Sequence, residues 1–319
     1  MDNRITKPRL SNFLAYEWLL ILLTFALAIL GWEVLFTVGK VKLTEGQAFY
    51  YYYDMNVSAN DDGFRNYLGD TFSYDILEVR GEKIPSESID VDVLTVKYSA
   101  KKLDAVFANG SLNEPDENGY RASRANTIVD AYEVLDFHSL YEMACDYLKG
   151  FLKTGESDYL IFSNLDTEKI EQCFYSRNGK DNRYRAGQIS AKNELERIEK
   201  LCLEVKDFKK ILEFDETLSA ENSIFYRYTK YEQAYKTSYF EKDRENYKEE
   251  YDLQTEKCYG LKLDKLPNTS TSEFFRIGSN TDSKDIVLMA VEFLGENKDL
   301  QFESIAFINT VVRSFSSVL

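Results

Sequence analysis

The feature that most constrains this chain is a charge-free stretch near its start. No charged side chain occurs between Trp18 and Trp32, and Glu17 and Glu33 border the run. With its apolar flanks the stretch covers residues 13–38. About 20 apolar residues, at 1.5 Å per residue, suffice to cross the ~30 Å hydrocarbon core of a bilayer. The chain's two tryptophans stand at the ends of the run, where this residue type meets lipid headgroups. We therefore predict a transmembrane anchor over 13–38.

A cleaved signal peptide is the main alternative to an anchor. Arg4, Lys7 and Arg9 supply the positive region that begins a signal peptide. A cleavage site, however, needs small residues after a short apolar core. The small residues Ala26 and Ala28 lie instead in the middle of the stretch. We therefore expect the segment to stay attached to the mature protein.

The basic residues also indicate an orientation. Three of them precede the stretch, whereas Lys40 and Lys42 follow it, and the first positive cluster usually dominates. This predicts a cytoplasmic tail over 1–12 and an extracytoplasmic domain over 39–319. The predicted localisation is the cell membrane, crossed once, with membrane lipid as the partner of the anchor.

Composition excludes some classes of function. The net charge is −15, and residues 1–39 hold three basic and three acidic residues, so the excess belongs to the predicted outer domain. Such a surface repels nucleic acid, which we exclude as a partner. The chain has one histidine and no CxxC pair, so we predict no metal site and no cofactor. The cysteines are too scattered to suggest a disulfide framework: Cys145, Cys173, Cys202 and Cys258.

Apolar periodicity predicts an α/β outer domain, with α+β as the alternative. Strands are expected at 48–57, 103–111, 126–136 and 285–294, in the segments 74–84 and 88–99 around a Gly-containing turn, and as a possibility at 158–164. Helices are expected at 139–153, 166–178, 190–214, 221–251 and at the C-terminus. These elements suggest an α/β lobe formed by 44–137 and 259–319, with a largely helical insert over 138–258.

Several stretches carry a resemblance to known proteins. They are the apolar stretch itself, "KKLDAVFANG" (101–110), "IVDAYEVLD" (128–136), "RNGKDNRYRAGQISAKNELERIEKL" (177–201), and "YGLKLDKL" (259–266) before "DIVLMAVEF" (285–293). Together they resemble single-pass membrane proteins of Gram-positive bacteria whose extracytoplasmic domain is similar to solute-binding proteins. The resemblance implies a binding-protein-like α/β lobe. It supplies no functional residues.

Two predicted strands end in small polar residues. In open α/β sheets, ligands bind outside the carboxyl ends of the strands. The turns after 48–57 and 103–111 therefore predict a site for a small neutral polar solute, with an adjacent tyrosine that stacks on it: Tyr53, Asn56, Ser58, Asn60, Asn109 and Ser111. Ordinary turn chemistry is the alternative, because Asn and Ser are common turn formers.

No pattern predicts a catalytic centre. His138 lies close in sequence to Asp136 and Ser139, but sequence neighbours rarely adopt the geometry of a catalytic triad. The leading hypothesis is a non-enzymatic, membrane-tethered protein that captures a solute or an envelope protein. The alternative is an accessory subunit of a transporter or cell-envelope assembly complex, with no small ligand. A third is an envelope hydrolase, whose carboxylate pair cannot be singled out among 54 acidic residues.

Overall fold

The structure, a computed structural model of the chain, divides into two units, residues 1–43 and 44–319. It describes the placement of residues 7–8, 11, 18, 22–33, 48–53, 57–59, 78–84, 90–111, 123–177, 190–232, 235, 245, 248, 251–267, 275–277, 284–295, 298–316 and 318–319. The predicted anchor belongs to the first unit, and the predicted α/β domain belongs to the second.

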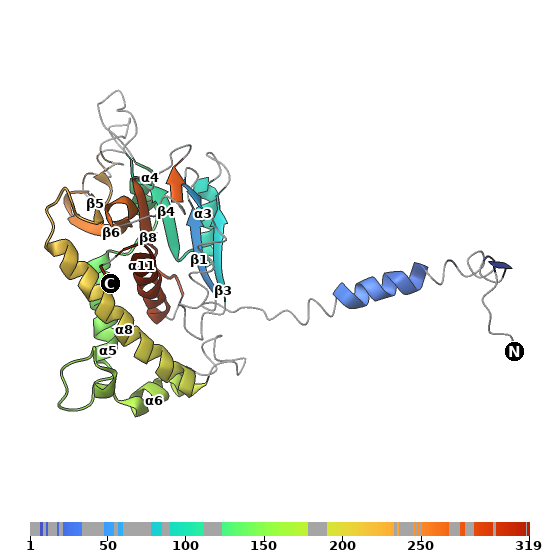
Figure 1. Cartoon of the computed structure of the whole chain (residues 1–319), viewed down its shortest axis with the longest axis horizontal. Helices are drawn as coiled ribbons and strands as arrows, with labels where there is room; N and C mark the ends of the chain where they lie inside the picture. Colours follow the sequence, from blue (N-terminus) through green and yellow to red (C-terminus); the bar gives the residue numbers. More distant parts are fainter. Residues whose placement is uncertain are drawn as a thin grey trace, which may run out of the picture. The chain divides into compact units, whose positions relative to one another are not determined.

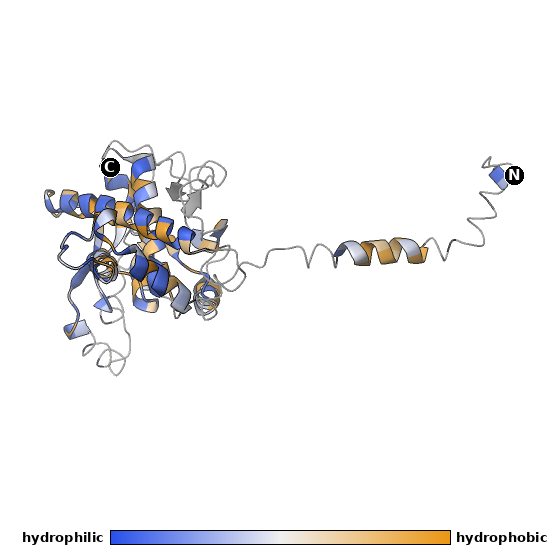
Figure 2. Ribbon diagram, turned by 90° about the horizontal axis from the view of Figure 1, so that it is seen from below, coloured by the Kyte–Doolittle hydropathy of each residue, from blue (hydrophilic) through white to orange (hydrophobic). Residues whose placement is uncertain are grey.

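In the first unit, residues 22–33 form a continuous helix. Its large apolar side chains are exposed, from Leu22 at 60% to Trp32 at 71%, and Figure 2 shows the helix as a largely hydrophobic ribbon. Among the residues that the structure describes, no helix is both long enough and apolar enough to cross a membrane. The transmembrane helix over 13–38 therefore stays a prediction.

The second unit is mixed α/β and contains a six-stranded sheet (Figure 1). The strands are β1 (Ala48–Tyr53), β3 (Glu78–Lys83), β4 (Ala105–Asn109), β5 (Phe225–Thr229), β6 (Glu256–Lys262) and β8 (Ile286–Ala290). Their order across the sheet is β3-β1-β4-β8-β6-β5. Strand β1 runs parallel to β3 and β4, whereas the remaining neighbours pair antiparallel. A second, two-stranded sheet joins β2 (Val57–Ala59) to β7 (Phe275–Ile277).

Helices cover both faces of the sheet (Figure 1). The residues of α3 (Asp90–Ser99) and α4 (Arg124–Ala131) pack in one hydrophobic cluster, and those of α5 (Phe137–Lys149), α8 (Ala191–Glu216) and α11 (Glu303–Phe315) pack in the other. Helix α6 (Thr167–Arg177) contacts α8, and short 3-10 turns are η1 (Phe162–Asn164), η2 (Leu263–Lys265) and η4 (Lys298–Phe302). The result is a three-layer α/β/α core.

Strand β1 is buried on both faces, which explains its run of aromatic residues. Tyr51 belongs to the cluster that contains α11, where Phe307 stacks on Phe49 with ring centroids 4.7 Å apart. Tyr52 belongs to the opposite cluster, together with Leu94 of α3. Successive strand residues alternate between faces, so each layer receives large rings from the same six residues. The predicted strand at 48–57 is confirmed over Ala48–Tyr53.

Two ionic clusters hold α8 against its neighbours, and the first of them is buried. The Arg197 guanidinium donates to Asp299 of η4 at 2.8 Å and to the hydroxyl of Tyr147 of α5 at 2.9 Å. Two helical turns further along α8, Glu204 accepts a hydrogen bond from Arg313 of α11 at 2.9 Å. Removing one partner of a buried ion pair leaves an uncompensated charge, which costs about 3–5 kcal/mol. These contacts therefore fix the position of α8 in the outer layer.

Several predicted elements are confirmed. The structure contains the predicted helices 139–153, 166–178 and 190–214 as α5, α6 and α8, the C-terminal helix as α11, and the strand 285–294 as β8.

Two predicted strands are wrong. Segment 88–99 contains α3, in which Leu94 and Tyr98, four residues apart, pack in one cluster at helical spacing. Segment 126–136 contains most of α4, whose N-cap is Ser123. Because the Ser123 hydroxyl accepts the Asn126 N–H at 3.1 Å, it satisfies a helix-start donor that a strand would not have.

Two further corrections concern the sheet. Segment 221–251, predicted as one helix, contains β5, where Tyr226 and Tyr228 pack on the same face at the two-residue period of a strand. The sheet therefore extends into the segment predicted as a largely helical insert. Gly81, predicted in a turn, lies within β3. A glycine is needed at this position because the Tyr51 ring occupies the space that a side chain would fill. Residues 158–164, a possible strand in the sequence, form turns and η1.

Strands β6 and β8 approach each other closely at Gly260. A Cβ atom there would lie 2.9 Å from the Leu288 carbonyl oxygen, so part of the backbone would have to move. We expect Gly260→Ala to lower the free energy of unfolding by about 2 kcal/mol, as overpacking of a filled core does. Urea unfolding followed by circular dichroism measures the change. Glu256→Ala, at an exposed position of β6, is the control, and a Gly260→Ala protein as stable as the wild type would contradict the close approach.

Candidate functional site

The structure brings part of the predicted ligand site together. Because β1 and β4 are parallel neighbours, Tyr53 and Asn109 both end their strands at the same edge of the sheet. Strand β2, which contains Ser58, contacts both β1 and β4. The strand order β3-β1-β4 corresponds to a 2-1-3 order along the chain, a reversal of the kind that marks ligand crevices in α/β sheets. The remaining predicted residues, Asn56 and Asn60, lie outside the described residues.

Asn109 and Ser111 form a local turn at this edge. The Asn109 side-chain oxygen accepts both the Ser111 N–H, at 2.8 Å, and the Ser111 hydroxyl, at 2.6 Å. Between them, the Gly110 N–H donates to the Asp285 carbonyl at 2.7 Å. The turn thus occupies the Asn109 oxygen, and a solute would meet the Asn109 amide NH2 group and backbone of the turn. Binding at these residues stays a prediction.

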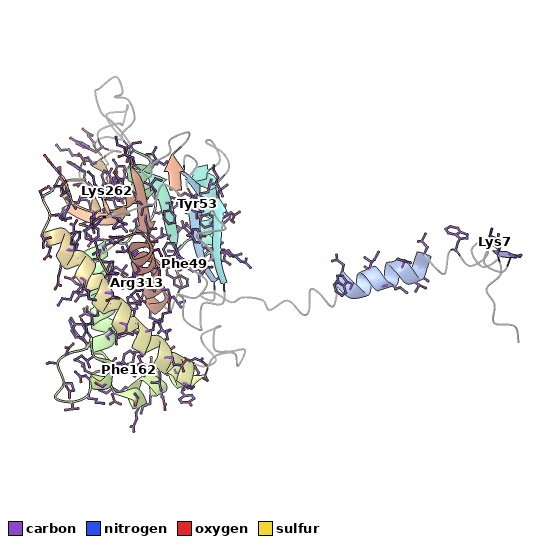
Figure 3. The ribbon with its side chains drawn as sticks, in the orientation of Figure 1. Lys7, Phe49, Tyr53, Phe162, Lys262 and Arg313 are labelled. Atoms are coloured by element: carbon purple, nitrogen blue, oxygen red, sulfur yellow. The ribbon has the colours of Figure 1, made fainter. Side chains whose placement is uncertain are left out.

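Tyr53 lies in the core rather than at an open surface (Figure 3). Its side chain is 1% exposed, and its ring stacks on Phe107 with centroids 5.4 Å apart. Tyr51 meets the ring edge-on at 5.4 Å. In this conformation no face of the Tyr53 ring is open to solvent. Stacking of a solute on Tyr53 would therefore require the core to open.

Tyr226 is a polar neighbour of the edge that the sequence does not reveal. A Cβ atom on Gly110 would lie 3.2 Å from its ring, which places the ring against the Asn109–Ser111 turn. Its hydroxyl donates to the Asn126 side chain at 2.6 Å and lies 2.8 Å from the Ser123 hydroxyl at the start of α4. Burial raises the pKa of Tyr226 to about 12, so it remains neutral. A neutral hydrogen-bonding surface suits an uncharged solute better than an ion.

The neighbours Asp136, His138 and Ser139 have structural roles. One oxygen of Asp136 accepts the Ser139 N–H at 3.0 Å and caps α5, and the other accepts the Cys258 N–H at 3.0 Å. The His138 ring lies edge-on to Phe225, with centroids 6.3 Å apart. Because both Asp136 oxygens accept backbone donors of α5 and β6, the geometry gives no support to a charge-relay arrangement.

The cysteines are free thiols, and three of them are buried. Burial raises the pKa of the Cys202 thiol to about 12 and that of Cys258 to about 11. Buried thiols held neutral in this way are poor nucleophiles and poor metal ligands. Within the described ranges, no group of three or more His, Cys, Asp or Glu side chains is arranged to hold a metal ion.

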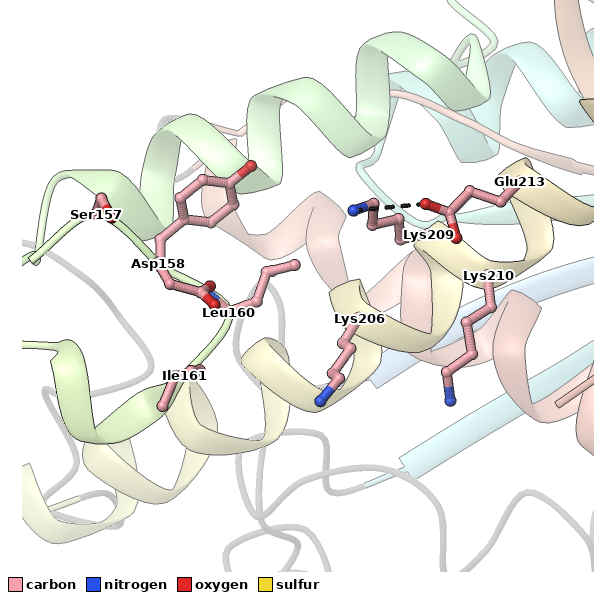
Figure 4. A pocket seen from close by; sticks show the side chains of 9 residues that line it. Ser157, Asp158, Leu160, Ile161, Lys206, Lys209, Lys210 and Glu213 are labelled. Atoms are coloured by element: carbon pink, nitrogen blue, oxygen red, sulfur yellow. Dashed lines mark hydrogen bonds and ion pairs between the residues drawn. The ribbon is translucent and has the colours of Figure 1, made fainter.

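A groove of about 560 Å³ lies on the helical layer (Figure 4). One wall is the segment between α5 and η1, and the other is the second half of α8. Its lining residues are Ser157, Asp158, Tyr159, Leu160, Ile161, Lys206, Lys209, Lys210 and Glu213. Its volume falls within the range of small-molecule and peptide sites, about 300–1,000 Å³. The sequence does not predict this groove.

The loop wall of the groove is fixed by its own bonds and by both flanking helices. Asp158 closes a turn, since its carboxylate accepts the Leu160 N–H at 3.0 Å. The Tyr159 carbonyl accepts the Cys202 thiol of α8 at 3.7 Å. A hydrogen bond to Cys145 of α5, with burial as the second cause, raises the pKa of the Tyr159 hydroxyl. The groove thus lies between elements that are tied to the core.

Three lysines on α8 form the other wall. Lys209 pairs with Glu213 at 3.5 Å, and Lys210 pairs with Asp207 at 2.7 Å. Burial opposes the charge of Asp207, but hydrogen bonds from Lys210 and Arg313 lower its pKa, so its carboxylate stays ionised. Lys206 makes no ion pair with any residue in the described part of the chain. Figure 4 shows Lys206 and Lys210 pointing to the same side of α8.

Comparison with known proteins finds no matching family, and it finds no significant match among curated proteins or solved structures.

A partly buried carboxylate with a perturbed pKa lies at the opposite end of β4. Asp104 accepts the Tyr50 N–H of β1 at 2.7 Å, and its backbone carbonyl accepts the Val291 N–H at 2.9 Å. Burial raises its pKa to about 7, and the hydrogen bond from Tyr50 only partly offsets that effect. Perturbed carboxylates often mark functional sites, but structural networks perturb them too. These backbone contacts assign Asp104 to the joining of strands.

We expect Asp104 to make stability depend on pH. A carboxyl group whose pKa is raised on folding stabilises the protein below the unfolded pKa near 4, and this contribution is lost as the pH rises to about 7. Asp104→Asn keeps an oxygen for the Tyr50 N–H without the buried charge. The variant should therefore be more stable than the wild type at pH 8 by about 4 kcal/mol, since each of the roughly three pKa units corresponds to about 1.4 kcal/mol, with the difference vanishing near pH 4. Urea unfolding across this range measures it, and a difference that grows as the pH falls would refute it.

Proposed function

We propose that this chain is a membrane-tethered, non-enzymatic binding protein with an extracytoplasmic α/β domain. The observation that carries the proposal is the contrast between its two units. Residues 22–33 form a helix whose apolar side chains are exposed, whereas residues 44–319 form a compact unit around a filled core. An exposed apolar helix is unfavourable in water and favourable in a lipid bilayer. The basic residues before the apolar stretch support a cytoplasmic N-terminus.

For the ligand, we propose a small neutral polar solute at the carboxyl edge of β1 and β4. The proposal is supported by the parallel pairing that brings Tyr53 and Asn109 to one edge, and by the Asn109 amide NH2 group, which the hydrogen bonds of the turn do not use. The likeness to solute-binding proteins in the sequence agrees with this placement. The buried ring of Tyr53 leaves hydrogen bonding as the means of recognition.

The second candidate is an accessory subunit of a transporter or envelope assembly complex, without a small ligand. Its support is the groove beside α8, which is separate in sequence from the predicted solute site. Its lining includes the exposed side chains of Ile161 and Lys206. A surface of this mixed character suits a protein partner better than a neutral solute.

The tether is tested by adding protease to intact cells. The expected result is digestion of the domain at 44–319, with the N-terminal tail protected and a mature N-terminus at or near Met1. The physical reason is that a retained apolar helix holds the chain in the membrane with its acidic domain outside. N-terminal sequencing and antibodies to each end give the readout. A mature chain that begins after residue 33, or a domain protected until cells are lysed, would refute the tether.

The solute site is tested by thermal unfolding of the full chain with neutral sugars, polyols and amides. A solute that binds the folded state raises the melting temperature. We expect at least one to do so for the wild type, and we expect the rise to be lost in Asn109→Ala, which lacks the amide group at the edge. Asn222→Ala, an exposed asparagine elsewhere, is the control. A rise that survives Asn109→Ala, or no rise with any of these solutes, would count against this site.

A further inference from the structure

The groove beside α8 combines cations with exposed apolar side chains. Lys206 and Lys210 are four residues apart, so their side chains are neighbours on one helix face. Ile161 on the facing loop lines the groove and is 45% exposed, and Leu203, which lies one turn before Lys206 and beside the groove lining, is 60% exposed. Lys210 is already paired with Asp207 at 2.7 Å, so the charge that a bound anion would mainly neutralise is that of Lys206.

The anionic side chains near these lysines are already engaged. Asp158 accepts a backbone hydrogen bond within its own turn, Glu213 pairs with Lys209, and Asp207 is shared between Lys210 and Arg313. Lys206 therefore presents a charge that the described protein does not neutralise. The chain as a whole, by contrast, carries a net charge of −15.

We infer that the groove docks an acidic, partly apolar peptide segment of a partner protein. Carboxylates of the segment pair with Lys206 and Lys210, and its apolar side chains cover Ile161 and Leu203. This inference rests on the proposal that the domain binds rather than catalyses. It adds a partner surface that is distinct from the solute edge.

Charge complementarity favours this occupant over other polyanions. An acidic segment is repelled by the chain's net negative charge and attracted at the lysine pair, which favours one orientation of docking. The carboxylates of Asp158 and Glu213 line the same groove. They oppose a continuous row of phosphates or a lipid surface, but they tolerate a peptide whose carboxylates are spaced by apolar residues.

The test uses the full-length chain in nanodiscs of neutral lipid. The probe is a short fluorescein-labelled peptide of alternating glutamate and leucine, followed by fluorescence anisotropy. We expect saturable binding that weakens as salt is added. The double variant Lys206→Glu/Lys210→Glu should bind about tenfold more weakly, because each reversal replaces an attraction with a repulsion. Both side chains are exposed, so the variant should fold, which circular dichroism checks.

The matched control is Lys102→Glu/Lys192→Glu, which makes the same change in net charge at exposed positions that do not line the groove. It should leave the peptide affinity within about twofold. Absence of peptide binding, or an equal loss in both double variants, would overturn the inference. So would tighter groove-dependent binding of inorganic polyphosphate or phosphatidylserine vesicles. The protease assay of the tether does not involve these lysines, so the two proposals fail separately.

Discussion

The burial of β1 on both faces is the constraint on which the rest of the fold depends. Its six residues carry five aromatic rings, and a strand points alternate side chains to opposite faces. Both faces therefore need an apolar cover, which Phe307 of α11 provides on one side and Leu94 of α3 on the other. Parallel strands buried on both faces are typical of α/β sheets, and the parallel pairing of β1 with β3 and β4 follows this rule.

How far the sequence predicts this fold depends on where the deciding contacts lie. Helix α8 is predictable because its signals are local, namely an apolar stripe at helical spacing and a cap at Ser190. Strand β5 is not predictable in this way, because the contacts that place its tyrosines are made with residues far away in the sequence. The Tyr226 hydroxyl contacts Ser123, which lies 103 residues earlier, and periodicity cannot show such a partner. Helix α3 is missed because residues 89–93 alternate between apolar and polar side chains, as a strand does. The contacts that decide the structure are those of Leu94 and Tyr98, which pack in one cluster at helical spacing.

The candidate sites show the same division. The meeting of the β1 and β4 ends follows from parallel order, a general property of α/β sheets. The burial of Tyr53 does not follow, because alternation tells which face a ring is on and not what covers it. The α8 groove escapes prediction for another reason. Lys206 and Lys210 look like an ordinary solvated helix face until the 157–161 segment, more than 40 residues earlier, is placed opposite them.

The distribution of charge agrees with the proposal that the domain binds other molecules. The buried Arg197 is matched by Asp299, because an unpaired charge in the core costs several kcal/mol, and the buried carboxylate of Glu204 is matched by the exposed Arg313. The buried thiols are held neutral, and Asp136 caps a helix. Reactive groups of the core are thus used for stability. The proposed binding function therefore rests on two other features, the apolar helix over residues 22–33 and the lysine pair on an otherwise acidic chain.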